Sequence, residues 1–214
     1  IWERNHLREI EAKMEKLKLV VATGNKNKLK EIQEILPTFD LVTMKEIGFN
    51  EEIVEDGKTF EENALIKARA VWKYCKGLVM ADDSGLEIDF LNKEPGIYSA
   101  RYMGENTSYK IKNENLISRL NGVEGNDRSA RFVAVIVCIL PTGEEIIVRD
   151  TMEGIISYEA KGENGFGYDP ILFLPEYQKT SAELSDEEKN KISHRGKALE
   201  KMKKELCKLE RQFK

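Results

Sequence analysis

Two adjacent carboxylates, Asp82 and Asp83, are the residues whose type and placement point most strongly to chemistry. They follow the apolar run 78–81, which predicts a buried strand, and they precede Ser84. Neighbouring carboxylates at the end of a buried strand repel each other and lose hydration. A divalent cation would offset that cost, because carboxylate oxygens are hard ligands. The alternative is an Asp-rich turn at Gly85, after which a second strand resumes with alternating apolar residues.

A polar loop after the first predicted strand, residues 18–22, is the second candidate. The loop reads Thr-Gly-Asn-Lys-Asn-Lys over residues 23–28, and a helix follows it up to Pro37. A strand, a small polar loop and a helix in this order aim backbone N–H groups at a phosphate, and Lys28 would add a mobile positive charge. The GxxxxGK[ST] motif of a P-loop is absent, so a plain turn with surface lysines is the alternative.

An acidic residue and a lysine flank the start of the next predicted helix. Glu55 lies in a polar segment just ahead of Thr59, which forms a predicted capping box with Glu62. Asn63 and Lys67 are four residues apart and therefore project from one side of the helix. Lys67 could face the same site as Glu55; a solvated helix lysine is the alternative.

A glycine-rich loop over residues 162–170 has residue types suited to binding a planar base. Its glycines allow a close approach of the backbone to a ligand, and its centre carries Phe166 and Tyr168. Exposed aromatic rings at this place would stack on a base, and Asp169 adds a hydrogen-bond acceptor. Folding of both rings into the core is the alternative.

A basic segment over residues 189–197 follows a second predicted capping box formed by Ser185 and Glu188. Within it, His194 and Arg195 stand beside a glycine at a helix start, where both side chains can donate hydrogen bonds to one ligand edge. A solvated basic face is the alternative.

The periodicity of apolar residues that must position these groups predicts an α/β chain. We expect strands at 18–22, 40–44, 78–81, 86–90, 131–140, 145–149 and 152–158, and helices at 1–17, 29–36, 59–75, 108–120 and 198–209. No repeat, low-complexity segment or linker divides the sequence. Two intertwined lobes are therefore favoured over two sequential domains.

Composition excludes several classes of protein. The chain has 214 residues and a net charge of −4, without a long basic run, which argues against a nucleic-acid coat or a polybasic membrane binder. The three cysteines are far apart and form no CxxC motif, which favours reduced thiols in the cytosol over a disulfide scaffold or a zinc site. No apolar run reaches 18 residues, so no membrane-spanning segment is predicted.

In combination, these stretches resemble the Ham1/inosine triphosphate pyrophosphatase family. The resemblance covers residues 18–210 and leaves residues 1–17 outside the family pattern. Five blocks stand in the family order: TGNKNK at 23–28, ADDSGLEID at 81–89, PGIYSARY at 95–102, GFGYDP at 165–170 and KTSAEL…EKNKISHRGKAL at 179–199.

The resemblance implies an elongated α/β fold in which a mixed twisted sheet is flanked by helices, with the active site in a cleft between two lobes. Residues 18–214 would form this one domain after an extension helix at 1–17. The implied reaction is Mg²⁺-dependent hydrolysis of noncanonical purine nucleoside triphosphates (ITP, dITP and XTP) to the monophosphate and pyrophosphate, which cleanses the nucleotide pool. The implied protein is a cytoplasmic homodimer that binds neither nucleic acid nor membrane.

The resemblance also implies a role for each candidate residue. Asp83 matches the general base and, together with Glu55, a metal ligand, whereas Asp82 would support the loop or a metal-bound water. The matches to phosphate and other substrate contacts are Thr23, Gly24, Asn25, Lys26, Asn27, Lys28, Lys67 and Ser84. The matches to the nucleobase pocket are Phe166, Gly167, Tyr168, Asp169, Lys189, His194 and Arg195. Some members of the family have Trp at the position of Tyr168, so this wall of the pocket differs within the family.

The hydrogen-bonding groups on the edge of the purine base suggest how such an enzyme would select its substrates. Inosine and xanthine present a 6-oxo acceptor where adenine presents an amino donor. A buried donor aimed at that atom, from Arg195 or a backbone N–H, would be left unpaired by ATP, and such a site can reject an analogue by about 10⁴-fold. Guanine shares the 6-oxo group, so its rejection requires a second feature near C2, for which the sequence identifies no residue.

Two other functions fit part of the pattern. A pyrophosphatase of the Maf-like relatives would act on modified pyrimidine or methylated nucleotides, but the intact GFGYDP and SHRG blocks argue against it. A nucleotide sensor without catalysis is the other; the acidic pair, Glu55 and the two lysines argue against it, because a pure anion binder gains little from carboxylates. Release of pyrophosphate from ITP separates these functions.

Overall fold

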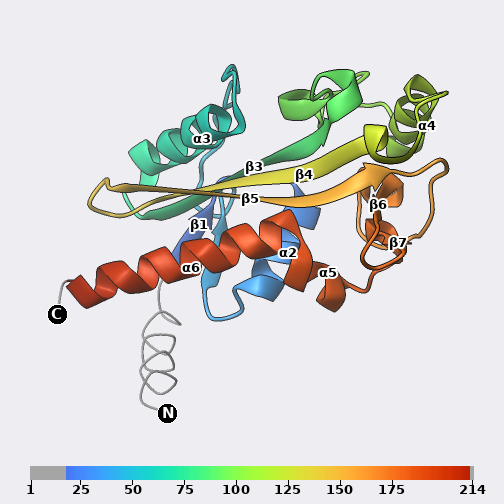
Figure 1. The fold of residues 1–214 in the computed structure, drawn as a ribbon. Coiled ribbons are helices and arrows are strands. Elements are labelled where there is room, and N and C mark those ends of the chain that lie inside the picture. The colour runs from blue at the N-terminus through green and yellow to red at the C-terminus, as the bar shows by residue number, and fades with distance from the viewer. Residues whose placement is uncertain (1–17, 213–214) are drawn as a thin grey trace, which may run out of the picture. The chain divides into compact units, whose positions relative to one another are not determined.

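A seven-stranded sheet with the order β2-β1-β3-β4-β5-β6-β7 organises the computed structural model, which describes residues 18–212 (Figure 1). Strand β1 is parallel to β2 and β3, whereas β6 is antiparallel to β5 and β7, so the sheet is mixed as predicted. The strands are β1 (Lys18–Val21), β2 (Asp40–Thr43), β3 (Leu78–Ile88), β4 (Ser129–Ile139), β5 (Glu145–Ile156), β6 (Leu172–Leu174) and β7 (Lys179–Thr180). The α-helices in the described residues are α2 (Lys26–Ile35), α3 (Phe60–Cys75), α4 (Tyr109–Arg119), α5 (Asp186–Ile192) and α6 (His194–Gln212).

Two compact units divide the chain, and neither is contiguous in sequence. The first contains the described residues up to Asp83, Val135–Arg149, and the chain from Ala198 onwards. The second contains Ser84–Ala134 and Asp150–Lys197. Strands β3, β4 and β5 each contribute residues to both units. The helix that the sequence predicts at 1–17 lies outside the described residues.

Helices cover both faces of the sheet in the first unit. Helix α2 connects β1 to β2, and α3 connects β2 to β3. Figure 1 shows α3 on one face, with α2 and α6 on the other. The residues of β1 that the helices cover are apolar on both sides: Leu19 and Val21 are 0% exposed, and Val20 is 6% exposed. A strand buried on both faces requires such a continuous apolar run, which is why residues 18–22 predict the strand so well.

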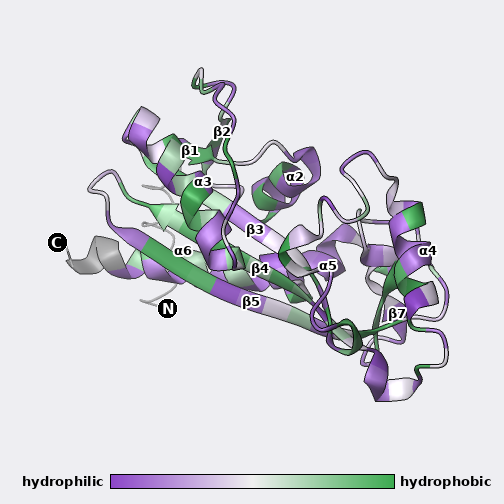
Figure 2. Ribbon diagram, turned by 90° about the horizontal axis from the view of Figure 1, so that it is seen from above, coloured by the Kyte–Doolittle hydropathy of each residue, from purple (hydrophilic) through white to green (hydrophobic). Residues whose placement is uncertain are grey.

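The hairpin of β4 and β5 extends further than the sequence predicts. Residues 132–139 of β4 are all buried, and β4 is largely hydrophobic in Figure 2. Strand β5 runs without interruption from Glu145 to Ile156, so the prediction of two separate strands at 145–149 and 152–158 is wrong. The polar residues at 149–151 do not break it, because a partly exposed strand accommodates polar side chains in extended backbone.

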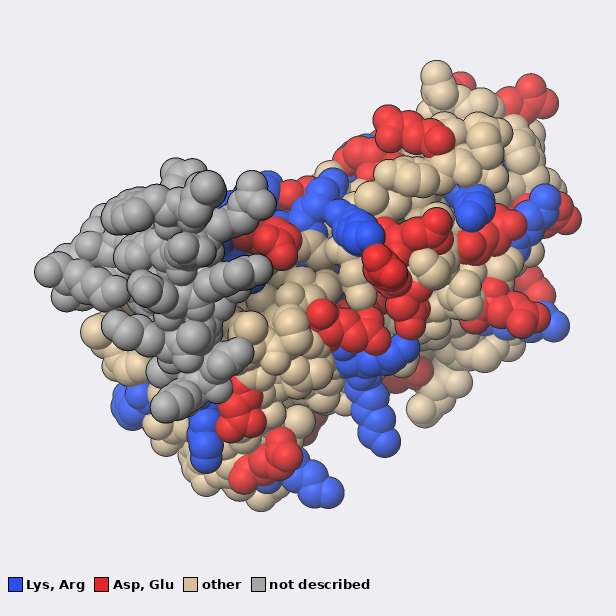
Figure 3. All heavy atoms as spheres, turned by 90° about the horizontal axis from the view of Figure 1, so that it is seen from below, with Lys and Arg blue, Asp and Glu red and all other residues tan. Residues whose placement is uncertain are grey.

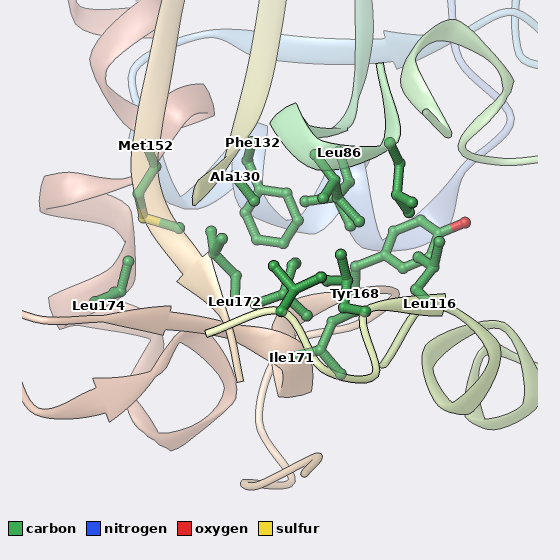
Figure 4. Packing of buried hydrophobic residues seen from close by; sticks show 14 of the residues in the cluster. Leu86, Leu116, Ala130, Phe132, Met152, Tyr168, Ile171, Leu172 and Leu174 are labelled. Carbon is green, nitrogen blue, oxygen red and sulfur yellow. The ribbon is translucent and has the colours of Figure 1, made fainter. Parts of the chain in front are cut away.

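A hydrophobic cluster fills the second unit (Figure 4). Strands β3, β4, β5 and β6, the helix α4 and the loop after Gly165 all contribute apolar side chains to it. Its most buried members are Leu86, Ile88, Leu116, Leu120, Ala130, Ile156, Ile171 and Leu172, each 0% exposed. Two parts of the candidate site lie on elements of this cluster: Ser84 is on β3, and Phe166 and Tyr168 are in the loop after Gly165.

Charged side chains of both signs are interspersed on the face of the molecule shown in Figure 3. This mixture agrees with the small net charge of −4. Within residues 18–212, no helix is long and apolar enough to span a membrane.

Candidate active site

Asp82 and Asp83 lie in the middle of a strand and not at its end. Strand β3 continues through both residues to Ile88, so the predicted break at 82–85, and with it the Asp-rich turn, is wrong. Strand β3 carries both hydrophobic and hydrophilic residues along its length in Figure 2. Asp82 is 0% exposed and Asp83 is 8% exposed. Successive side chains of a strand point to opposite faces of the sheet, so the two carboxylates serve different faces.

Each carboxylate is paired with a lysine from the helix on its own face. Lys28, on α2, forms an ion pair with Asp82, and Lys67, on α3, lies with its Nζ 3.2 Å from Oδ1 of Asp83. The two helices cover opposite faces, as Figure 1 shows. The pairing therefore follows from the strand alternation and from the two crossover connections.

The carboxylates lie where a doubly wound sheet offers a binding site. The last residue pair between β1 and β3 is Val21 with Met80, and the N–H of Ala22 donates to the carbonyl of Met80 at 2.7 Å. Beyond this pair β1 ends, and its chain continues into the loop at 23–25. The connections after β1 and before β3 lie on opposite faces, and ligands bind at the carboxyl ends of strands at such a switch point.

The predicted phosphate loop is shorter than the sequence suggests. Helix α2 begins at Lys26, so Lys26, Asn27 and Lys28 form its first turn and the prediction that they belong to the loop is wrong. Asn25 is the N-cap, because its Oδ1 accepts hydrogen bonds from the backbone N–H groups of Asn27 and Lys28 at 3.0 and 3.2 Å. Residues 24–27 are exposed, whereas Thr23 and Lys28 are partly buried. The exposed helix start remains suited to an anion.

Lys67 lies between two carboxylates. Its Nζ is 2.8 Å from Oε2 of Glu55 and 3.2 Å from Oδ1 of Asp83. Burial acts to lower the pKa of Lys67, but attraction to Asp83 and Glu55 outweighs it, so the pKa is raised and the lysine is charged at neutral pH. Burial raises the pKa of Asp83, and the attraction of Lys67 and Lys28 only partly opposes that rise.

The acidic residues of this group fit a divalent cation. The second carboxylate oxygen of Asp83, Oδ2, is buried and has no hydrogen-bond partner in the described residues. A buried carboxylate oxygen without a donor is costly, and a cation would satisfy it. The described residues contain no group of three or more acidic, His or Cys side chains that could hold a metal. Two carboxylates suit Mg²⁺, which takes its other ligands from water and phosphate.

The capping box predicted at the start of α3 forms only in part. The hydroxyl of Thr59 accepts from the N–H of Glu62 at 3.1 Å, as predicted. The carboxylate of Glu62, however, accepts from the N–H of Lys58 at 2.6 Å and not from the N–H of the cap residue itself. The side chain of Glu62 thus binds the backbone of the residue directly before the cap. The second predicted box, at Ser185 and Glu188, is complete.

A buried ion pair shapes the glycine-rich loop in the second unit. Asp169 is 2% exposed and accepts from Lys189 Nζ at 2.7 Å, from the N–H of Phe166 at 2.8 Å and from the hydroxyl of Ser181 at 2.7 Å. Gly165 packs against the same carboxylate, and a Cβ there would lie 2.1 Å from Oδ2 of Asp169. The sequence suggests the carboxylate of Asp169 as an acceptor for a ligand, but in the structure this carboxylate binds the loop itself.

The two aromatic residues of the loop have different surroundings. Phe166 is partly exposed, and its ring centroid is 5.1 Å from Lys189 Nζ and 5.9 Å from Cζ of Arg195. Tyr168 is 5% exposed and belongs to the hydrophobic cluster, so for this ring the core placement is the correct one of the two interpretations (Figure 4). Its hydroxyl donates to the carbonyl of Ser99 at 2.6 Å. Only Phe166 keeps a face for stacking on a base.

Ser84, His194 and Arg195 are brought together in the second unit. Arg195 is 1% exposed and its guanidinium donates to the hydroxyl of Ser84 at 2.9 Å. His194 is 7% exposed, and its ring packs on Phe132 with 5.0 Å between the ring centroids. Both basic residues are buried at the start of α6, so the solvated basic face is excluded for this pair. A buried guanidinium is a donor that discriminates between acceptors and donors on a ligand.

Helix α4 supplies residues that the sequence analysis missed. Asn113 donates from Nδ2 to the carbonyl of Gly167 at 3.1 Å, and the ring of Tyr109 packs edge-on against Tyr168 with centroids 5.1 Å apart. Together they hold the glycine-rich loop on the helix. The one available signal was the four-residue spacing of Tyr109 and Asn113, which places them on one side of α4.

The sheet topology and the residues around Asp83 define an α/β protein with an acidic, lysine-flanked site just beyond the carboxyl end of β1, where its parallel pairing with β3 ends. The Ham1 family model matches residues 19–205, and the chain belongs to the Ham1 family.

The match to two similar proteins extends over almost their whole length. The dITP/XTP pyrophosphatase of Clostridium perfringens is 49% identical over 197 residues, which is 88% of this chain and 97% of the relative. The Bacillus subtilis dITP/XTP pyrophosphatase is 49% identical over 189 residues, covering 87% and 96%. The solved Staphylococcus aureus Ham1 protein superposes with a TM-score of 0.81 at 42% identity, over 88% of this chain and 97% of that one.

Proposed function

We propose that this protein hydrolyses noncanonical purine nucleoside triphosphates, namely ITP, dITP and XTP, to the nucleoside monophosphate and pyrophosphate. The near-complete coverage of relatives named dITP/XTP pyrophosphatase at 49% identity supports the reaction. The observation that carries the proposal to these residues is the buried Oδ2 of Asp83, which has no partner in the described residues although two lysines flank the acidic pair. A site for anions alone would not keep such a carboxylate.

Glu55 and Asp83 are the proposed ligands of Mg²⁺. The nucleoside triphosphate carries about four negative charges at neutral pH, and carboxylates alone would repel it. Bound Mg²⁺ would neutralise phosphate charge, polarise the α-phosphate and acidify a water. We expect pyrophosphate release to stop on chelation with EDTA and to return when Mg²⁺ is added in excess.

Asp83 acts as the general base in the proposed reaction. As the water oxygen bonds to the α-phosphorus, Asp83 accepts the proton, and the bond from the α-phosphorus to the bridging oxygen breaks. Pyrophosphate leaves with that oxygen, and the charges of Lys28 and Lys67 stabilise it.

Residues of the second unit would bind and discriminate the base. Phe166 offers the partly exposed ring for stacking, and Arg195, held by Ser84, is the buried donor for the 6-oxo group. Asp169 and Lys189 fix the loop between them, and Tyr168 supports it from the core. Adenine presents an amino donor at the position of the 6-oxo group, so ATP should be a poor substrate.

The deciding experiment compares kcat/KM for ITP, XTP, GTP and ATP with pyrophosphate and orthophosphate measured separately. We expect pyrophosphate from ITP and XTP, and a loss of about 10⁴-fold with ATP. Equal values for all four nucleotides would remove the selectivity, and release of orthophosphate would place the cleavage at a different bond.

We also propose that the protein works in the cytoplasm as a homodimer. The family resemblance supports the dimer, and the three cysteines without disulfides agree with a reducing compartment. Light scattering at several protein concentrations should give twice the chain mass of 24.5 kDa. A mass of one chain at all concentrations would contradict the dimer.

A further inference from the structure

We propose that Asn63 is a positioning residue that fixes Glu55 for the metal, an inference that rests on the proposed function. Asn63 lies on α3 and is 1% exposed. Its Oδ1 accepts a hydrogen bond from the backbone N–H of Gly57 at 2.9 Å. Gly57 is two residues after Glu55, so the buried amide holds the segment that carries the proposed ligand.

Glu55 is thus held at two points by side chains from one helix face. Lys67 is four residues after Asn63 on α3 and binds the carboxylate of Glu55 at 2.8 Å. Asn63 binds the backbone just beyond it. The side chain of Glu55 is 32% exposed and would otherwise sample several rotamers, whereas a metal site requires its ligands in fixed positions.

The fit between this segment and the helix is tight. A Cβ on Gly57 would lie 2.6 Å from Oδ1 of Asn63 and 2.8 Å from Cβ of Glu62, so only glycine allows this approach. Because Oδ1 of Asn63 accepts from the N–H of Gly57 at 2.9 Å, replacing Asn63 by Ala leaves both a void and an unpaired N–H at Gly57. Residues that orient metal ligands in this way change metal affinity by about 10- to 100-fold when they are removed.

The test measures metal binding and not turnover. Mn²⁺ is titrated by electron paramagnetic resonance into the full chain with the α,β-imido analogue of ITP at saturation. We expect Asn63→Ala to weaken Mn²⁺ binding by about tenfold or more. An unchanged Mn²⁺ affinity in a folded Asn63→Ala protein would overturn the assignment.

A double-mutant cycle shows whether the effect passes through Glu55. In a Glu55→Gln background, we expect Asn63→Ala to change Mn²⁺ affinity by less than about twofold, because the group that it positions is gone. Full additivity of the two losses would mean that Asn63 acts on general stability.

Glu62→Ala is the matched control. Glu62 binds the same segment one residue further on, at the N–H of Lys58, and its side chain is exposed. We expect a lower thermal midpoint with Mn²⁺ affinity kept, and an equal loss of affinity would contradict the specific role of Asn63. Pyrophosphate release by the wild-type protein is measured in parallel, so its absence would refute the proposed function, whereas release without the Asn63 effect would refute only this inference.

Discussion

At the scale of single residues, the two adjacent aspartates have separate tasks because strand geometry separates them. Asp82 is fully buried and paired with Lys28, which suits a supporting role. Asp83 shares Lys67 with Glu55 and keeps one oxygen without a partner in the described residues. This difference makes Asp83 the better candidate for the base.

We expect Asp83→Asn to keep nucleotide binding largely intact and to lower kcat by about 10²-fold or more, because the amide cannot accept the proton. Steady-state kinetics with ITP measures this, and Asp82→Asn is the matched control with a smaller expected loss. Turnover near the wild-type value in Asp83→Asn would exclude Asp83 as the base.

The same substitution should not lower stability without metal. Burial raises the pKa of Asp83, so the folded protein binds this proton more tightly than the unfolded chain does, and the ionised form is destabilising at neutral pH. Asparagine has no charge to desolvate. We expect Asp83→Asn in EDTA to melt at or above the wild-type temperature at pH 7, with the difference shrinking as pH falls through the raised pKa. A clearly lower melting temperature at pH 7 would mean that the bond to Lys67 outweighs the burial cost.

At the scale of elements, the conformation of the glycine-rich loop depends on the close approach of Gly165 to the carboxylate of Asp169. Gly165 has a φ of +71° and leaves room for the Asp169 carboxylate, which a Cβ would meet at 2.1 Å. The loop conformation and the buried Asp169–Lys189 pair therefore require each other.

We expect Gly165→Ala to raise KM for ITP by about tenfold or more, because the loop must move away from the buried ion pair. Gly122→Ala is the control: φ there is +79° and a Cβ meets nothing within 4 Å, so it adds backbone strain without a clash. We expect it to lower the melting temperature and leave KM unchanged. If the two variants had the same KM, the loop geometry would not matter for substrate binding.

An ion cluster at the end of β3 should make stability depend on pH. Asp89 accepts from Arg131 at 2.8 and 3.0 Å and from Ser129 at 2.6 Å. The hydrogen bonds from Arg131 are the main reason that the pKa of Asp89 is well below its usual range. A lowered pKa stabilises the fold above the unfolded value of about 3.9, and this contribution is lost as pH falls towards the folded value.

We therefore expect Asp89→Asn to lower the free energy of unfolding by about 1 kcal/mol at pH 7. The difference from wild type should shrink below about pH 4, where the carboxylate of the unfolded wild-type chain is protonated. Urea unfolding at pH 7 and pH 3 measures both values. A difference that does not change with pH would exclude the ionic contribution.

At the scale of the whole molecule, the residues proposed to bind the phosphates and those proposed to bind the base belong to different units, which are adjacent in sequence at one point. Asp83 is the last residue of its segment in the first unit, and Ser84 is the first residue of the second unit. A nucleotide that binds only the folded protein would raise its free energy of unfolding by about 2.7 kcal/mol at a ligand concentration of 100 Kd.

Thermal unfolding should therefore shift upwards as one transition when the α,β-imido analogue of ITP and Mg²⁺ are added together. The ATP analogue at the same concentration should give a much smaller shift, because the proposed Arg195 donor has no acceptor to bind. A shift in only part of a two-step transition would mean that the nucleotide engages one group alone.

Local patterns in the sequence predicted much of the secondary structure correctly. The apolar run at 18–22, the helix starts at Thr59 and Ser185, and the hairpin at Pro141–Glu144 were predicted correctly, because each depends on neighbouring residues. The Asp-Asp-Ser-Gly stretch was predicted to break the strand, because these residues favour turns when nothing else constrains them. The place of β3 between β1 and β4 in the sheet, and the two lysines from the flanking helices, override that local preference.

By itself, the sequence determined which residue types are available as candidates for the chemistry, since the acidic pair, the lysines and the glycine-aromatic loop are visible at set spacings. The tertiary structure decided which of them act together. Strand alternation sends Asp82 and Asp83 to opposite faces, the core takes Tyr168 and leaves Phe166 exposed, and the amide of Asn63 holds the segment of Glu55. These outcomes depend on contacts between residues distant in sequence, which local propensity does not encode.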